Sequence, residues 1–193
     1  LIREAHKINK IAVVHISKSR DAYEVLKMGA NGLAHLWRDA LISEEKLDEI
    51  AQLDSIFIIP TLITNVKAIN YLKGKNPDAK VISPLQLKHE LNRIYKKGIA
   101  ILAGTDPPNL GINYGTDLYE ELKLFSEAGM SNLDILKSVT SNIMNAFAIK
   151  NKGYVKEGFD ADLILINGNP LDNIEEISNI EHIWKAGQLV TND

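Results

Sequence analysis

Three side chains that can bind a metal ion stand at the ends of short apolar runs. His15 ends "IAVVH", His35 ends "NGLAH", and Asp106 follows "ILAGT". If these runs are neighbouring parallel strands, their carboxyl ends meet on one face, where the active sites of parallel barrels form. Two imidazoles and one carboxylate suit Zn²⁺ or another borderline divalent ion. The pattern therefore predicts a metal site built from residues that lie far apart in the sequence.

Each of these residues has a simpler interpretation when taken alone. A single histidine at a strand end is more often packed or solvated than a ligand, and aspartate is common in turns and helix caps. Only their shared placement in successive units favours metal binding. The remaining histidines lack that placement and are predicted to be structural or solvated: His6, His89 and His182. The chain has no cysteine, so the metal ligands must come from His, Asp or Glu.

The elements that must position these residues alternate along the chain. Strands are expected at 11–15, 31–35, 55–62 and 99–104, and helices at 19–29, 43–53, 83–98 and 116–129, with Ser19 and Ser43 as N-caps. Four successive strand–helix units imply parallel pairing through right-handed crossovers. The strands are nearly all apolar, as expected for strands covered on both faces. The long segment 63–82 is expected to be functional or partly helical.

The pattern changes after Gly129. Residues 131–149 are expected to form one or two helices, and Ser131 is placed to cap the first of them. Strand character returns in 153–190, where "KAG" lies between two β-rich runs and indicates a hairpin. The predicted fold is α/β: a partial (β/α) barrel over 1–150 that carries the metal-site residues, and a small C-terminal β segment over 151–193.

Several stretches resemble the amidohydrolase superfamily. "AVVHI", "GLAHL", "IIPTL" and "ILAGTD", in this order, are similar to strands five to eight of its barrel. The "G-x-x-x-x-G-x-x-ADL" stretch from Gly153 to Leu163 resembles its C-terminal closure. The imidazolonepropionase-like and prolidase-like branch is the most similar. The resemblance implies that the chain holds only the second half of the barrel, with a C-terminal segment that belongs to a composite β-sandwich.

The resemblance also assigns roles to the three residues. It makes His15 and His35 the metal ligands of the fifth and sixth strands, and Asp106 both a metal ligand and the proton shuttle. The implied reaction is hydrolysis of a C–N bond in an amide, a cyclic amide or a dipeptide by metal-activated water, with zinc as the expected ion. Pro107 is expected to bias Asp106 toward an extended backbone.

The chain departs from the family pattern in two ways. The first-strand His-x-His pair and the fourth-strand lysine or carboxylate that bridges metals are absent, so the chain alone is expected to be incomplete. The missing N-terminal half of the barrel, or a second copy, would have to complete it; Leu1 in place of Met agrees with this expectation. Tyr114 and Trp37 occupy positions where relatives often have other residues, and both are expected to line the substrate pocket.

Composition excludes some partners and leaves two alternatives open. The net charge is −3 and no basic run is present, so no nucleic acid is expected. No apolar run approaches the roughly 20 residues that span a bilayer, and no signal peptide is recognised. We therefore expect a cytoplasmic protein that acts on a small molecule. A non-catalytic half-barrel that binds or scaffolds remains open, as does a phosphate-binding barrel enzyme, which "GTDPPNLG" suits poorly because proline lacks an N–H.

Overall fold

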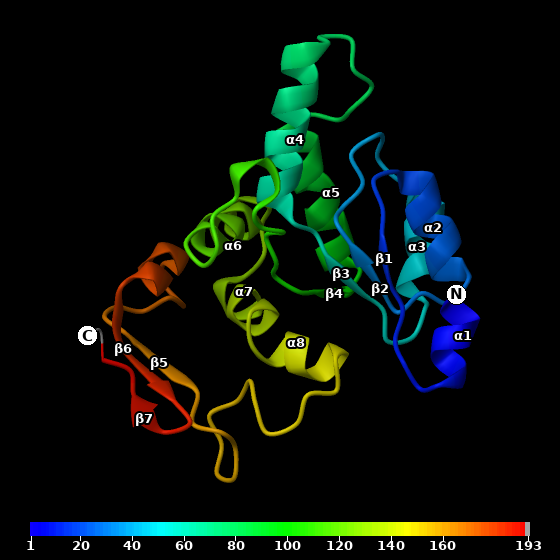
Figure 1. Ribbon diagram of the computed structural model, residues 1–193. Coiled ribbons are helices and arrows are strands. Elements are labelled where there is room, and N and C mark those ends of the chain that lie inside the picture. Colours follow the sequence, from blue (N-terminus) through cyan, green and yellow to red (C-terminus); the bar gives the residue numbers. More distant parts are fainter. Residues whose placement is uncertain (192–193) are drawn as a thin grey trace.

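The structure, a computed structural model, describes residues 1–191 and confirms the α/β class. Four short strands pair in parallel in the order β1-β2-β3-β4: β1 (Val13–His15), β2 (Gly32–Ala34), β3 (Phe57–Ile59) and β4 (Ala100–Ile101). The ribbon in Figure 1 shows them side by side. The register pairs His15 with Ala34 and Ala34 with Ile59, so the carboxyl ends of the strands are level with one another.

The helices that follow the strands bury apolar side chains in the core, whereas α1 precedes β1 and has no buried residue. The first half of the chain contains α1 (Ile2–Lys7), α2 (Ser19–Lys27), α3 (Glu44–Ala51), α4 (Leu62–Lys75) and α5 (Pro84–Lys96). One core cluster joins Leu33 and Ile58 of the strands to Leu26 of α2, Leu47 of α3 and Leu91 of α5. No helix in the part of the chain that the structure describes is long and apolar enough to cross a membrane.

Local sequence signals account for some of the helix starts. The hydroxyl of Ser43 accepts the N–H of Lys46, and that of Ser131 accepts the N–H of Asp134, so both predicted caps are confirmed. Ser19 was predicted to cap its helix, and this is wrong. Ser19 is the first helical residue, and its N–H donates instead to Asp39 at 2.8 Å.

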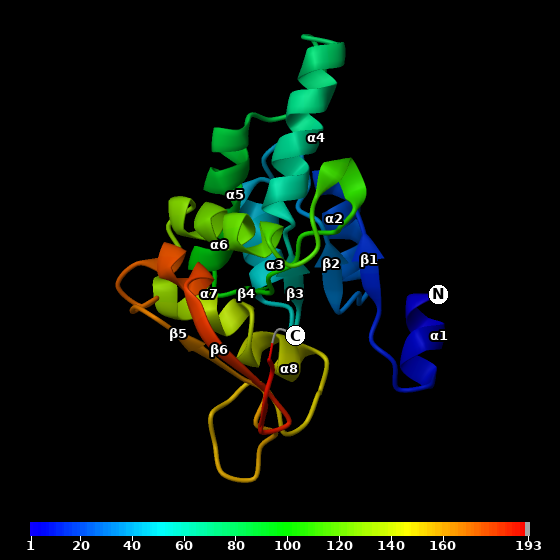
Figure 2. The ribbon, with the colours of Figure 1, turned by 60° about the vertical axis from the view of Figure 1, so that its left-hand side comes forward.

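The segment after β3 is helical rather than a loop. Helix α4 begins at Leu62 and occupies most of the segment that was expected to be functional or partly helical. Its far end and the connection to α5 extend beyond the rest of the molecule in both ribbon views (Figures 1 and 2). Only its first turn therefore lies near the carboxyl ends of the strands.

After β4, the chain forms η1 (Asn109–Gly111), α6 (Asp117–Glu127), α7 (Asn132–Ser138) and α8 (Ser141–Ala146). It then forms an antiparallel sheet from β5 (Leu163–Ile166), β6 (Ile180–Lys185) and β7 (Gln188–Leu189), with η2 (Ile174–Ser178) between the first two strands. The predicted hairpin at "KAG" joins β6 to β7, with positive φ at Ala186 and Gly187. This sheet is separate from the parallel sheet (Figure 1).

The two edges of the parallel sheet differ. At the β4 edge, the Asn142 amide donates to Ile101 O at 3.4 Å, and Ala103, just after the strand, donates its N–H to the carbonyl of Ser138. On β1, the described residues provide a neighbour on one side only, and the side chains of Ile11 and Val13 are 41% and 37% exposed. The β1 edge is therefore open to pairing with a further strand.

An ion-pair cluster ties α3 to α5 behind the sheet. Glu44 accepts Nη2 of Arg93 at 2.7 Å and Nζ of Lys97 at 2.6 Å. The hydrogen bonds from Lys97 and Arg93 lower the pKa of Glu44 from its ordinary 4.5 to about 2. Between those two values the unfolded chain binds more protons at this group than the folded chain does, so the stabilisation is lost as pH falls from 4.5 to 2.

We predict that Glu44→Gln makes unfolding less sensitive to acid. The wild type should lose stability faster than the variant as pH drops from 4.5 to 2, because only the wild type carries this depressed carboxyl pKa. Urea unfolding at a series of pH values measures the effect, with the exposed neighbour Glu45→Gln as the control. Parallel pH profiles for wild type and Glu44→Gln would contradict the assignment.

Candidate metal centre

The structure brings the three predicted ligands together at the carboxyl end of the parallel sheet. The rings of His15 and His35 meet edge to face, with their centroids 4.5 Å apart. Nε2 of His35 lies 3.8 Å from Oδ2 of Asp106. The His35 side chain is buried, whereas His15 is exposed and the Asp106 side chain is 41% exposed. The cluster therefore has a buried centre and an open outer side.

Three residues that follow successive strands have a positive φ: His35 (75°), Thr61 (44°) and Asp106 (64°). This conformation is costly for residues with a side chain, on the order of 1–3 kcal/mol each, and it tends to occur at functional sites. The expectation that Pro107 holds Asp106 in an extended conformation is wrong. Asp106 instead starts a turn in which its carbonyl accepts the N–H of Asn109 at 3.1 Å, and aspartate tolerates a positive φ better than most residues do.

One nitrogen of His35 is already occupied. Its Nδ1 lies 2.7 Å from Oγ1 of Thr61, which leaves Nε2 facing Asp106. Burial lowers the pKa of His35, the nearby His15 lowers it further, and Asp106 opposes the shift. The neutral ring that results is the form that binds metals, and the partner of the second nitrogen fixes which nitrogen is available.

The loop after β4 holds Asp106 in place. Its Oδ2 accepts the side-chain amide of Asn109 at 3.0 Å. The hydroxyl of Thr64 donates to the carbonyl of Thr105, and Nζ of Lys67 donates to Gly111 O at 3.1 Å. Helix α4 thus fixes both ends of the turn that carries Asp106.

The donor set matches a divalent ion in its chemistry but is only part of a site. Two atoms that each lie about 2.1 Å from one ion are at most about 4.2 Å apart, so a His35–Asp106 separation of 3.8 Å allows a shared ion. Among residues 1–191, however, no group of three His, Cys, Asp or Glu side chains is arranged to hold a metal. The site would need a further ligand or a modest closure around the ion.

Of the two residues expected in the substrate pocket, Trp37 is buried and Tyr114 is exposed. Trp37 is 0% exposed, and its indole N–H donates to Oε1 of Glu90 on α5 at 2.8 Å, so the structure places it in the core. Tyr114 is 71% exposed in the loop before α6. The structure therefore offers Tyr114, and not Trp37, as a side chain that a ligand could reach.

Several residues that support the site were not singled out as site residues from the sequence. Thr61 orients His35, and Asn65 donates to the carbonyls of Leu36 and Pro60, each at 3.0 Å. Glu121 of α6 is 0% exposed and accepts two N–H groups at the start of α4. A signal for Glu121 was present, because it falls on the apolar stripe of its helix, where a charged residue requires an explanation.

Comparison with known proteins agrees with this geometry. Residues 1–190 match the amidohydrolase family. The chain belongs to that family. This confirms the superfamily that the strand-end motifs indicated, and it supports a hydrolase.

Individual relatives of this amidohydrolase chain are distant and longer. Ochratoxinase of Aspergillus niger is 24% identical over 206 residues, which cover 98% of this chain and 40% of ochratoxinase. The 5'-deoxyadenosine deaminase of Methanopyrus kandleri is 26% identical over 173 residues, covering 76% of this chain and 40% of the deaminase. A Xaa-Pro dipeptidase crystallised with methionine has the same fold, with a TM-score of 0.79, 20% identity, and coverage of 99% of this chain and 47% of its own. The chain thus spans less than half the length of these relatives.

We predict that Trp37→Phe affects stability and leaves substrate binding unchanged. The substitution removes one donor to the buried Glu90 carboxylate, which should lower the free energy of unfolding by about 1–3 kcal/mol. Urea unfolding and KM measured on the full-length protein test this, with the partly exposed Trp184→Phe as the control. A large rise in KM with unchanged stability would instead place Trp37 at the substrate.

Proposed function

We propose that this chain is the ligand-bearing second half of a metal-dependent amidohydrolase that hydrolyses C–N bonds of an amide, a cyclic amide or a dipeptide. Membership of the family supports a hydrolase, and relatives named ochratoxinase, deaminase and Xaa-Pro dipeptidase support this class of reaction. The approach of His35 Nε2 to Asp106 Oδ2, at 3.8 Å with the His15 ring beside them, carries the proposal.

In this proposal His15, His35 and Asp106 hold a divalent ion, with zinc as the expected metal because imidazole and carboxylate ligands suit it. A bound ion of this kind lowers the pKa of a coordinated water and polarises a substrate carbonyl. His35 contributes through Nε2, because Thr61 occupies Nδ1. His15 is free to adjust, since it lies at the exposed side of the cluster.

Asp106 is the proposed proton shuttle. Its carboxylate lies beside His35 and is partly open to solvent, so it can face both the attacking water and the substrate. One of its oxygens is held by Asn109, which leaves the other available to take the proton of the water. The same carboxyl group can then pass that proton to the departing nitrogen.

We further propose that strands from outside this chain complete the barrel. Four strands cannot close an eight-stranded barrel, and β1 has an unpaired edge with Ile11 and Val13 partly exposed. The chain spans 40% of ochratoxinase and 47% of the dipeptidase. This partial coverage supports further strands of the same protein as those that pair with β1. Residues 151–191 would then belong to a composite β-sandwich. If a second copy of the chain paired with β1 instead, sedimentation of the full-length protein would show a dimer.

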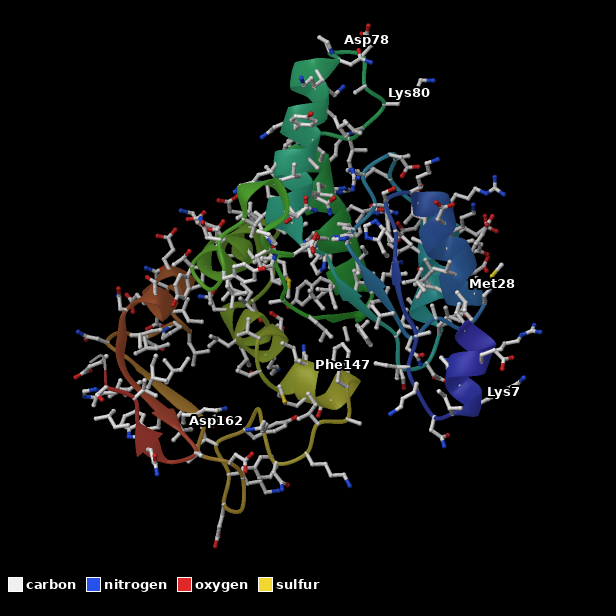
Figure 3. All side chains as sticks on the ribbon, in the orientation of Figure 1. Lys7, Met28, Asp78, Lys80, Phe147 and Asp162 are labelled. Carbon is white, nitrogen blue, oxygen red and sulfur yellow. The ribbon has the colours of Figure 1, made fainter. Side chains whose placement is uncertain are left out.

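The proposal predicts that Asp106→Asn in the full-length protein lowers kcat by about 10²–10⁴-fold, because proton transfer is lost. A panel of N-acyl amino acids, cyclic amides and dipeptides serves as substrates, and plasma mass spectrometry gives the zinc content. Asp78→Asn is the matched control, because Asp78 lies at the tip of the α4–α5 connection (Figure 3), beyond the end of α4 that is distant from Thr61.

Two results would count against the proposal. Near wild-type hydrolysis by Asp106→Asn would remove Asp106 from the mechanism. A full-length wild type that carries no metal and hydrolyses none of the panel would favour the non-catalytic interpretation of the half-barrel.

A further inference from the structure

The hydroxyl of Thr61 does not do what its position predicts. Thr61 is the N-cap residue of α4, and a threonine there normally accepts an N–H from the first turn of its own helix. The structure shows no such bond, and the residue has a φ of 44°. Its hydroxyl lies instead 2.7 Å from Nδ1 of His35, in a buried setting. The start of α4 therefore needs a different cap.

Glu121 supplies that cap from another helix. Its Oε1 accepts the N–H of Leu62 and its Oε2 accepts the N–H of Ile63, both at 2.8 Å. These are the first two N–H groups of α4, where the helix dipole also favours a negative charge. Burial raises the pKa of Glu121 to about 8, and the two N–H donors oppose that shift by stabilising the ionised form.

Asn65, one turn further along α4, fixes the same region. It is 1% exposed, and its side-chain amide donates to the carbonyls of Leu36 and Pro60, each at 3.0 Å. These carbonyls follow β2 and β3, so the first turn of α4 is tied to the strand ends that carry His35 and Thr61. A displacement of that turn would therefore move the Thr61 hydroxyl relative to the imidazole.

We propose that Glu121 is a positioning residue for the metal centre: by capping α4 in place of Thr61, it leaves the Thr61 hydroxyl free to hold the His35 ring with Nε2 facing Asp106. The inference rests on the proposed function in one respect, since it assumes that His35 Nε2 is a metal ligand. Partners of the second nitrogen of a ligating histidine typically change metal affinity by about 10–100-fold when they are removed. Within residues 1–191 the hydrogen bonds of the Glu121 carboxyl group go to Leu62 and Ile63, and not to His15, His35 or Asp106, so its effect on the site would pass through Thr61.

The alternative is that Glu121 only stabilises the fold. A buried carboxyl group that caps a helix can raise the free energy of unfolding without any effect on the metal centre. The two cases predict different results for the double variant. If Glu121 acts through Thr61, its substitution cannot have its full effect on zinc affinity once the Thr61 hydroxyl is removed.

The test uses the full-length protein with Thr61→Val, Glu121→Gln and the double variant. Thr61→Ser keeps the hydroxyl, and Glu120→Gln changes an exposed glutamate on the same helix, so these two are the controls. Two properties are measured well below the unfolding temperature: the zinc dissociation constant by chelator competition, and the ¹⁵N shifts of the His35 ring in the metal-free protein.

We expect Thr61→Val to weaken zinc binding by about 10–100-fold, with Thr61→Ser and Glu120→Gln near wild type. Glu121→Gln places an amide N–H₂ against one of the two N–H groups, and it should weaken zinc binding and shift the His35 ring signals in the same direction as Thr61→Val. The double variant should bind zinc no more weakly than Thr61→Val by itself. If Glu121→Gln does not fold, Glu121→Asp, which keeps the carboxyl group but reaches less far, is judged by the same measurements.

Unchanged zinc affinity and unchanged His35 signals in the Glu121 variant would overturn the proposal. So would full multiplication of the two effects in the double variant. If the wild type binds no zinc, the proposed function fails, while the His35 signals of the metal-free protein still decide whether Glu121 acts on the ring through Thr61.

Discussion

The parallel register of the four strands brings the candidate ligands to one edge of the sheet. His15 and Asp106 lie far apart in the sequence, yet both lie beside His35. They meet there because the four strands are parallel and their carboxyl ends are level. A shift of one strand by a single residue would turn its last side chain to the other face. The large apolar residues that fill the space behind the sheet, such as Leu33 and Ile58, oppose such a shift.

The cluster at the strand ends stores backbone strain that the surrounding structure compensates. His35, Thr61 and Asp106 all have a positive φ, and each is held by bonds from α4 or its neighbours. Asn65 ties the helix to the carbonyls after β2 and β3, Thr64 binds the carbonyl before Asp106, and Glu121 closes the first turn from α6. Helix α4 is therefore the element that joins three strand ends into one site.

Sequence patterns were sufficient for the alternation of strands and helices, the caps at Ser43 and Ser131, and the strand-end position of the three candidate ligands. They failed where tertiary contacts decide. Ser19 donates its N–H to Asp39 instead of capping its helix, and Asp106 has a positive φ instead of an extended backbone. Trp37 is buried and bonds to Glu90, a residue distant in the sequence that local patterns do not indicate. Two buried glutamates gave a signal that periodicity could have detected, because each occupies an apolar helical stripe: Leu87, Glu90, Leu91 and Ile94 in α5, and Leu118, Glu121, Leu122 and Phe125 in α6.

In the proposed function, two imidazoles and a carboxylate share one cation at the rim of the sheet. Anomalous diffraction at the zinc edge, from crystals of the full-length protein grown with zinc, tests this most directly. We expect a peak at about 2.0–2.2 Å from His35 Nε2, with both His15 and Asp106 also in its coordination sphere. A zinc peak held by other residues, with His15, His35 and Asp106 all outside its coordination sphere, would contradict it.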